Sequence, residues 1–252
     1  MSLMELAIET IDLHKIYKRD NVHAVNGINL KIHRGEIYAF IGANGSGKTT
    51  TIDMLSGILK PTSGKINIWG MQQPKDLKKI SPYIGIAPQD YSLYMDLSVR
   101  ENIEFFGKLY RLGSKRVKEN TKKLLKILNL EEKEDVLAEF LSGGMKRRLS
   151  IACALIHEPM ILLFDEATVG VDPILRVYFW DYFRQLRNEG KTILLTSHVM
   201  DEAEKADRIG LMRNGKIIEE GTPGELKEKY NVNNIEDIFI LLSKEGDDID
   251  EP

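Results

Sequence analysis

The stretch Ile37–Ile52 constrains the fold of this chain more than any other part of the sequence. Ile37–Ile41 is an apolar run with the length of a buried strand, Gly42–Thr49 is the glycine-rich loop GANGSGKT, and Thr50–Leu59 has helical periodicity. Glycines let the backbone N–H groups of such a loop turn inward, and the following helix adds positive partial charge at its N-terminus. The order strand, loop, helix therefore predicts a phosphate-binding loop rather than a glycine-rich turn with an exposed lysine.

The side chains of this loop fit a nucleoside triphosphate with its metal. Lys48 can neutralise the β- and γ-phosphates, and Thr49 offers a hydroxyl to Mg²⁺, which takes only one or two oxygen ligands from a protein. The other predicted contacts come from the loop and the first helical turn, at Gly42, Asn44, Gly45, Ser46, Gly47 and Thr50.

Composition restricts the class of protein. With 252 residues, 42% hydrophobic and 29% charged, the chain has the composition of a soluble globular protein. The net charge of −3 gives no general attraction for nucleic acid, so no nucleic-acid partner is expected. The single cysteine, Cys153, lies in an apolar helical pattern and is interpreted as a core residue. No apolar run reaches the ~20 residues that span a bilayer, and the expected location is the cytoplasm.

The order of apolar patterns predicts an α/β fold. Short strand patterns before the phosphate loop, with a turn at Asn26-Gly27, indicate an antiparallel β flap. The pattern is helical from Ser98 to Ile156, and its basic stretch Lys115–Lys126 is interpreted as a solvated helix face. We expect a core of residues 1–89 and 157–221, an inserted α-helical subdomain at about 90–156, and a C-terminal helical extension at 222–252. The acidic end from Glu245 is expected to be disordered.

Two adjacent carboxylates end the buried strand predicted at Met160–Phe164. Such charges are costly there without a cation. Asp165 can bind Mg²⁺ through a water, and Glu166 can orient or deprotonate a water that attacks the γ-phosphate. An acidic turn is the alternative, and the phosphate loop earlier in the chain favours the catalytic interpretation.

Three further residues have both a functional and a structural interpretation. Gln89 follows a strand that stops at Pro88, and its amide suits a Mg²⁺ ligand or a metal-bound water; the alternative is a loop glutamine. His198 follows the apolar strand Thr192–Thr196 and can donate to a γ-phosphate oxygen, or it is a turn residue. Tyr17 lies about thirty positions before the loop and can lay its ring on a base, or it serves packing.

A second glycine segment, Ser142-Gly143-Gly144, precedes the helix predicted at Met145–Ile156. Ser142 can cap this helix, and the glycines leave backbone N–H groups open to an anion. Basic residues in the first turn, Lys146–Arg148, run against the usual helix-dipole preference. On these residues alone, a capped helix with a flexible entry is the simpler interpretation.

In combination, these motifs resemble the ATP-binding-cassette (ABC) ATPases. The match covers roughly residues 5 to 221, and its serine-glycine-glycine segment is far more specific than the phosphate loop. The motifs occur in the family's order, at Gly42–Thr49, Gln89, Leu141–Gly144, Ile161–Glu166, Asp172 and His198. The segments after Asp172 and around His198 look most like ATPase subunits of ABC-2 type, drug-resistance exporters. The resemblance implies an ABC ATPase domain at 1–221, with a P-loop NTPase (RecA-like) core.

The resemblance also assigns roles. Tyr17 would stack on adenine, Lys48 and the loop amides would hold the phosphates of ATP, and Thr49 and Asp165 would serve Mg²⁺. Met145 stands where the family usually has glutamine, so no side-chain contact to nucleotide is carried over to it.

The catalytic roles implied by the family fall on the remaining motifs. Gln89 would sense the metal and the attacking water, Glu166 would be the catalytic carboxylate, and His198 would contact the γ-phosphate. Asp172 would lie on the loop that crosses a dimer interface. Ala167, in place of a frequent proline, is expected to have little consequence.

Assembly follows from the same resemblance. Two cassettes would pair head to tail, with each ATP between the phosphate loop of one copy and Ser142–Gly144 of the other. A separate transmembrane permease would hold the pair at the cytoplasmic face of the membrane. The alternative is a soluble ABC-type mechanochemical ATPase acting on DNA or ribosomes. About 94 positions separate Gly47 from Leu141, too few for the long coiled-coil insertion of such relatives.

Overall fold

A six-stranded, mostly parallel sheet forms the centre of the computed structural model, which describes residues 6–19, 21–166, 168 and 171–247, with backbone only for 243–247. The spatial order is β10-β9-β3-β8-β7-β6, and only β10 runs antiparallel to its neighbour. The strands are β3 (Ile37–Ile41), β6 (Ile84–Ala87), β7 (Ile161–Asp165), β8 (Thr192–Ser197), β9 (Arg208–Arg213) and β10 (Lys216–Gly221). Parallel strands align their carboxyl ends, so the segments that follow β3, β7 and β8 lie together at the carboxyl end of the sheet.

A four-stranded antiparallel sheet confirms the predicted flap. Its order is β2-β1-β4-β5, with β1 (Leu6–Tyr17), β2 (Val22–His33), β4 (Ser63–Ile68) and β5 (Met71–Gln73). The prediction that Asn26-Gly27 separates two strands is wrong, since both residues lie inside β2. Gly27 has a φ of 78°, and the register shifts where Leu13 pairs with Ile28 and His14 with Asn26. The glycine therefore makes a bulge that bends the strand without ending it.

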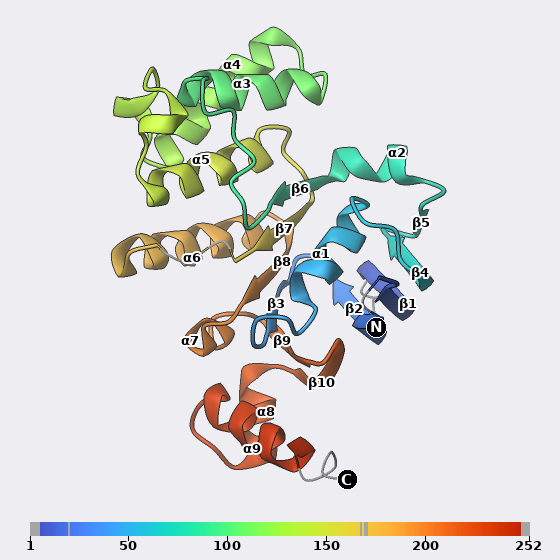
Figure 1. Ribbon diagram of the computed structural model, residues 1–252. Coiled ribbons are helices and arrows are strands. Elements are labelled where there is room, and N and C mark those ends of the chain that lie inside the picture. The colour runs from blue at the N-terminus through green and yellow to red at the C-terminus, as the bar shows by residue number, and fades with distance from the viewer. Residues whose placement is uncertain (1–5, 20, 167, 169–170, 248–252) are drawn as a thin grey trace.

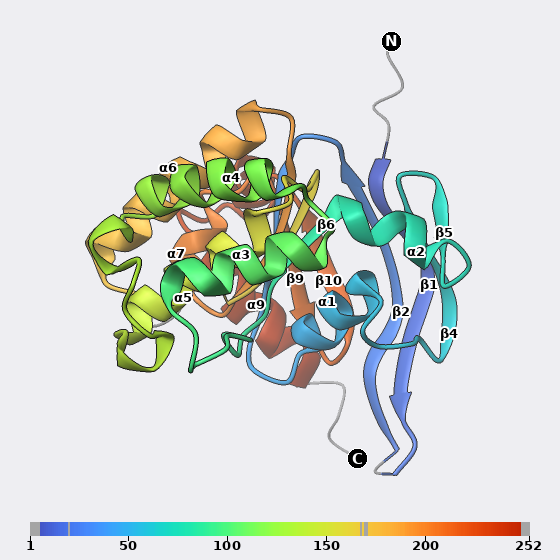
Figure 2. The same cartoon turned by 90° about the horizontal axis from the view of Figure 1, so that it is seen from above.

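Seven of the nine described helices lie in three places (Figure 1). A group of three forms a lobe above the parallel sheet, as the helical pattern from Ser98 predicts; α6 and α7 pack on the sheet; and the last two lie at the opposite end from the lobe. The described helices are α1 (Lys48–Ser56), α2 (Leu77–Ile80), α3 (Val99–Leu109), α4 (Ser114–Ile127), α5 (Gly143–Leu155), α6 (Pro173–Asn188), α7 (Met200–Ala203), α8 (Pro223–Tyr230) and α9 (Ile235–Asp247). Seen from above, the lobe and the β1–β2 hairpin lie on opposite sides of the molecule (Figure 2).

Two helix ends differ from the predictions. Gly57 ends α1 in the left-handed conformation, with a φ of 83°. Ile58 therefore lies beyond the helix and is 70% exposed, not on its buried face. At the other end of the chain, α9 continues to Asp247, so the predicted disorder from Glu245 is wrong for residues 245–247, while 248–252 lie outside the described residues.

The core of the described residues consists of two apolar clusters, one on each face of the parallel sheet, because successive side chains of a strand point to opposite faces. Ile37, Ala39 and Ile41 of β3 belong to one apolar cluster, on the side of α5 and α6. Tyr38 and Phe40 belong to a second cluster, shared with the antiparallel sheet and α1. Cys153 is buried in the first cluster, and burial raises the pKa of its thiol, which confirms the predicted core role. Among the described helices none is long and apolar enough to cross a membrane.

Candidate nucleotide site

The backbone of the phosphate loop is fixed by close packing against two strands. Gly47 has a φ of 103°, and a Cβ on it would lie 2.3 Å from the carbonyl oxygen of Ala24 in β2. A Cβ on Gly42 would lie 2.3 Å from the carbonyl oxygen of Met212 in β9. Only glycine fits either position. No side chain caps α1, so the N–H groups of its first turn are open to an anion.

Lys48 is turned into the loop. Its ammonium group donates to the carbonyl oxygens of Gly42 at 2.7 Å and Ala43 at 2.9 Å, and the residue is only 4% exposed. Burial lowers the pKa of Lys48, against the opposing charges of Glu166 and Asp165. The hydroxyl of Ser46 is buried without a hydrogen-bond partner among the described residues. These features fit a loop that receives phosphate oxygens.

Thr196 contacts both residues of the predicted acidic pair at the end of β7. Its hydroxyl donates to a carboxylate oxygen of Asp165 and accepts the backbone N–H of Glu166 at 3.0 Å. Glu166 has a φ of 52°, a left-handed conformation that is strained for glutamate. Sequence reasoning missed Thr196, although the pairing of Asp165 with Thr196 in the parallel register follows from strand alignment.

The structure brings Gln89, Glu166 and His198 together. One carboxylate oxygen of Glu166 lies 3.3 Å from the side-chain amide nitrogen of Gln89, and the other lies 3.0 Å from Nδ1 of His198. Glu166 is 8% exposed, whereas Gln89 and His198 are both exposed. The carboxylate is therefore held from two sides by groups that follow β6 and β8.

Tyr17 lies on the hairpin that packs against the phosphate loop. It is the last residue of β1 and pairs with Val22, two residues before the Ala24 carbonyl that meets Gly47. The ring is 41% exposed, with the ammonium group of Lys15 5.5 Å from its centroid. The position suits a base bound beyond the loop, although the stacking itself stays a prediction.

Ser142 caps α5 as predicted. Its hydroxyl accepts the N–H of Met145 at 3.3 Å, and Gly143 and Gly144 form the first turn. The basic side chains of that turn bend away to carbonyl groups: Lys146 to Glu139, Arg147 to Pro88 and Asp165, and Arg148 to Leu128 and Asn129. Within the described part of the chain, no hydrogen bond or ion pair joins residues 142–144 to residues 42–50.

Arg147 is a connecting residue that the sequence did not reveal. Its guanidinium donates to the carbonyl of Pro88, next to Gln89, at 2.5 Å, and to the carbonyl of Asp165. Burial lowers the pKa of Arg147. A run of three basic residues gives no indication that the middle one points inward and ties α5 to the carboxylate segment.

The donor set suits Mg²⁺ shared with phosphate oxygens. Thr49 offers a hydroxyl, Asp165 a carboxylate and Gln89 an amide oxygen, and Mg²⁺ combines one or two such groups with phosphate and water. Within the described residues there is no cluster of three His, Cys, Asp or Glu side chains that could hold a metal alone. The residues present thus fit a metal that arrives with a nucleotide.

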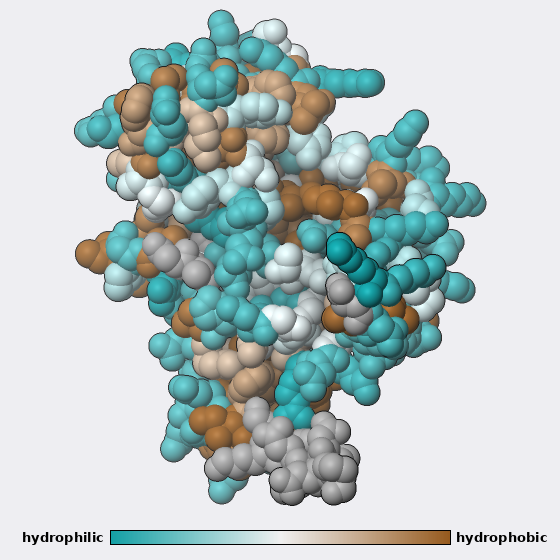
Figure 3. Space-filling model, viewed as in Figure 1, coloured by the Kyte–Doolittle hydropathy of each residue, from teal (hydrophilic) through white to brown (hydrophobic). Residues whose placement is uncertain are grey.

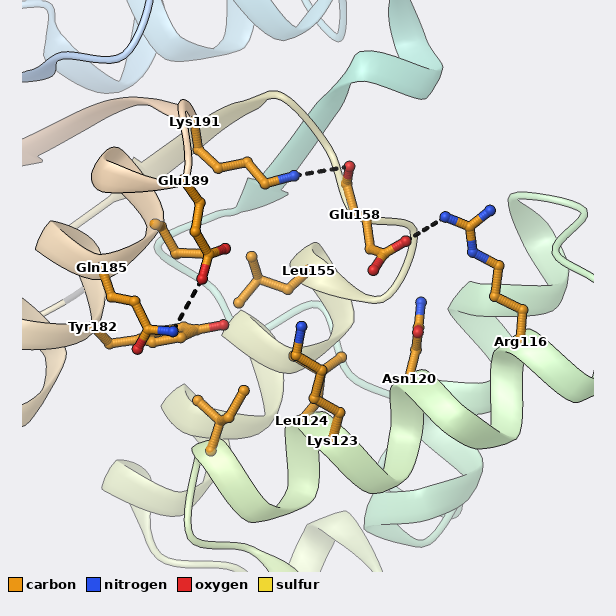
Figure 4. A pocket seen from close by; sticks show the side chains of 12 residues that line it. Arg116, Asn120, Lys123, Leu124, Leu155, Glu158, Tyr182, Gln185, Glu189 and Lys191 are labelled. Atoms are coloured by element: carbon orange, nitrogen blue, oxygen red, sulfur yellow. Dashed lines mark hydrogen bonds and ion pairs between the residues drawn. The ribbon is translucent and has the colours of Figure 1, made fainter.

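A separate cavity of about 390 Å³ lies near the amino ends of the parallel strands β7 and β8 (Figure 4). Arg116 and Asn120 of α4 face Tyr182 and Gln185 of α6 across it. Arg116 is paired with Glu158, and the ammonium group of Lys191 donates to the Glu158 carbonyl at 3.2 Å. Glu158 and Lys191 precede β7 and β8, so this cavity lies at the amino ends of the strands, away from the phosphate loop.

Comparison with known proteins agrees with this geometry. Residues 25–169 match the family model described as "ABC transporter". The chain belongs to the ABC transporter family. The match includes the phosphate loop, Gln89, Ser142–Gly144 and Glu166.

Relatives of this ABC chain carry transporter names. It is 40% identical over 223 residues to a probable multidrug ABC transporter ATP-binding protein, YbhF, of Escherichia coli, covering 88% of this chain but only 38% of that relative. It is 39% identical over 225 residues to a Nod factor export ATP-binding protein I of Burkholderia lata, covering 88% of this chain and 74% of that protein.

Solved ABC structures have the same fold. The structure of an ATP-binding subunit of an ABC transporter matches with a TM-score of 0.86 at 25% identity, covering 94% of this chain and 99% of that one. A dimeric ATP-binding cassette in a post-hydrolysis state, bound to ADP and Pi, matches with a TM-score of 0.80 at 27% identity, covering 85% and 98%.

Proposed function

We propose that this chain binds and hydrolyses ATP to power a membrane exporter. The observation that carries the proposal is the position of Glu166 at the end of β7, held between Gln89 and His198 beside the phosphate loop. The names of the relatives support the transport part, as does the match of residues 25–169 to the ABC transporter family. No observation favours an action on DNA or ribosomes.

The chain's own side chains account for the steps of hydrolysis. On nucleotide binding, Lys48 exchanges its two carbonyl partners for phosphate oxygens. Glu166 accepts a proton from a water whose oxygen attacks the γ-phosphorus, and the bond to the β–γ bridging oxygen breaks to give ADP and phosphate. His198 pairs with Glu166 through Nδ1, and as an imidazolium, with protons on both ring nitrogens, it would also donate to the γ-phosphate through Nε2. Bound Mg²⁺ would neutralise phosphate charge, held by Thr49, Asp165 and Gln89.

A second copy of the chain, or a homologous cassette, would complete the site. Ser142–Gly144 presents a capped helix N-terminus in the lobe, with no contact to the phosphate loop of its own chain among the described residues. In a head-to-tail pair this N-terminus would face the γ-phosphate bound to the other copy. ATP would then join the two copies, and hydrolysis would release them.

A permease would take up the motion of the lobe. A hollow between the core and the lobe is lined by residues from β6, the following loop, α3, α5 and the segment after α1, among them Ile58, Ile86, Tyr91 and Phe106. Figure 3 shows apolar surface between the lobe and the strands on this face. Such a hollow suits a short cytoplasmic helix of a separate membrane protein, which would place this chain at the cytoplasmic face.

The substitution Glu166→Gln tests the proposed chemistry. It removes the proton acceptor but keeps the shape of the side chain, so we expect kcat for ATP to fall by at least about a hundredfold while ATP still binds. The same variant should form a dimer with Mg²⁺-ATP in light scattering. Lys48→Ala serves as the control that loses nucleotide binding itself. Normal turnover by the Glu166→Gln variant would contradict the assignment.

A further inference from the structure

We propose that the ion pair between Glu202 of α7 and Arg176 of α6 positions His198 for hydrolysis. α7 begins two residues after His198, and α6 begins directly after Asp172. The pair therefore joins the segment that carries the histidine to the helix that starts at the predicted dimer-interface loop. The inference deepens the proposed function, since it rests on the proposed role of His198.

Glu202 is a buried carboxylate that the proposed chemistry does not use. Its exposure is 0%, and neither of its oxygens has a hydrogen-bond partner among the described residues. The nearest cation is Arg176, whose Nε lies 3.8 Å from one carboxylate oxygen and has no hydrogen-bond partner either. A buried charge is costly unless it is paired and hydrogen-bonded. The pair is close enough for charge attraction but lacks the hydrogen bond that a small approach of α6 and α7 would form.

The first turn of α6 contacts two segments of the proposed site. These are the start of α5 at Gly144 and, through Arg176, the helix α7 that follows His198. The carboxylate of Asp172 caps α6 by accepting the N–H of Leu175 at 2.9 Å. Leu175 lies against Gly144, where a Cβ would be 3.7 Å from its side chain. Arg176, the next residue, reaches Glu202. A shift of the Ser142–Gly144 helix against α6 is thus transmitted through one ion pair to the helix that follows His198.

Glu202→Gln separates this role from a structural one. Glu202→Gln removes the fully buried charge, whose oxygens have no hydrogen bond to lose among the described residues, and it leaves Arg176, which is 28% exposed, to be solvated by water. We expect the thermal midpoint to be retained, kcat for ATP to fall about tenfold, and KM to change less than twofold. Arg176→Gln should lower the thermal midpoint, because it leaves the buried Glu202 charge unpaired, and below that midpoint it should give the same loss in kcat. The double variant should lose no more kcat than either single variant.

Two exposed ion pairs provide matched controls. Arg184 on the same helix pairs with Asp181, and Glu204, two residues after Glu202, pairs with Lys227. Arg184→Gln and Glu204→Gln should keep kcat within twofold. Additive losses in the Arg176–Glu202 double variant, or equal losses in the controls, would overturn the proposal.

A spectroscopic readout tests the same variants without turnover. The chain has five histidines, and His198→Ala assigns the imidazole resonance of His198 in NMR spectra. We expect that resonance to shift in Glu202→Gln and to stay in place in Glu204→Gln. If Glu202→Gln leaves both kcat and the resonance unchanged while Glu166→Gln and His198→Ala lose turnover, the inference fails and the proposed function stands. If His198→Ala keeps full turnover, the proposed role of His198 fails instead.

Discussion

Glu166 combines backbone strain, burial and two polar neighbours in one residue. A φ of 52° costs about 1–3 kcal/mol in a residue with a side chain, so the surroundings must hold it. The hydroxyl of Thr196 and the neighbours Gln89 and His198 do so. Glu166 follows the last residue of β7 with this left-handed backbone, and its carboxylate lies close enough to Lys48 of the phosphate loop for the two charges to interact. The left-handed backbone of Glu166 is therefore a stronger indication of a functional role than its burial is.

His157 is a half-buried titratable residue away from that site. Its ring stacks on Tyr110 at 3.6 Å between centroids, and Nε2 lies 3.0 Å from the carbonyl oxygen of Ile84. Burial lowers the pKa of His157 to about 4, whereas histidine in an unfolded chain titrates near ~6.5. As the pH falls between these values, the unfolded chain binds the proton first. The stability that neutral His157 contributes is therefore present above pH ~6.5 and is lost toward pH 4.

Stability as a function of pH tests this linkage. We expect the free energy of unfolding to fall by about 1–2 kcal/mol from this residue between pH 7 and pH 5. His157→Gln keeps a donor for Ile84 but does not titrate, so its curve should be flatter over the same interval. Urea unfolding at each pH measures both proteins. Parallel curves for the two would show that His157 does not titrate as described.

At the scale of elements, the sequence predicted those that have a period or a continuous apolar run. β3, β7 and β8 were predictable because strands covered on both faces contain apolar residues throughout. The hairpin β9–β10 turns at Asn214-Gly215, both with positive φ, and such an Asn-Gly pair between two strand patterns is typical of a hairpin. The continuation of β2 through Gly27 was not predictable, since a glycine that makes a bulge reads like one that makes a turn.

Site contacts between distant elements were predictable only in part. Glu166 and His198 were predicted separately, and the strand order of the structure, which brings the ends of β7 and β8 together, explains why they meet. The contacts of Arg147 and of the Arg176–Glu202 pair depend on how helices rotate against the sheet. The spacing of residues in a single sequence does not determine how each helix is rotated about its axis against the sheet.

The loop between β6 and α3 illustrates how a buried side chain can hold an irregular segment. Asn102 has 0% exposure and donates to the carbonyls of Tyr94, Leu97 and Ser98, while its oxygen accepts the N–H of Tyr94 at 2.9 Å. These hydrogen bonds fix the residues 94–98, which connect the Gln89 end of the loop to α3 of the lobe. A helix-face asparagine gives no such indication in the sequence.

The hollow beside this loop gives a prediction about the membrane partner. Ile58 lines it and is 70% exposed, so Ile58→Asp should leave the fold intact while placing a charge in an apolar contact. We expect the variant to lose co-purification with a co-expressed permease that the unaltered chain retains. Ile240→Asp, on the exposed side of α9 at the far end of the molecule, is the control that should keep it. Equal recovery of the permease with both variants would contradict docking at the hollow.

At the scale of the whole molecule, two anion-binding helix N-termini lie in different parts of the chain. α1 begins after the phosphate loop in the core, and α5 begins after Ser142 in the lobe. Arg147 and the first turn of α6 join the lobe to the carboxylate segment. In the proposed function, the core would supply the catalytic side of the site, and the α5 N-terminus would supply the half that a second copy uses.

The substitution Gly144→Asp in a Glu166→Gln background isolates that half site. A Cβ at Gly144 meets only the side chain of Leu175, at an ordinary 3.7 Å, and aspartate suits the first turn of a helix, so the chain should fold. The added carboxylate would repel the γ-phosphate of ATP bound to the other copy. We expect affinity for ATP in the monomer within about twofold of the parent, and loss of the ATP-dependent dimer in light scattering.

Gly113→Asp in the same background is the matched control, because Gly113 precedes another lobe helix, α4, and a Cβ there meets nothing within 4 Å. It adds the same charge at a comparable helix start and should keep the dimer, since that helix is not expected to meet nucleotide. Dimers of unchanged stability with Gly144→Asp would show that the α5 N-terminus does not face the γ-phosphate. Loss of the dimer with both variants would assign the effect to net charge and would equally count against the head-to-tail site.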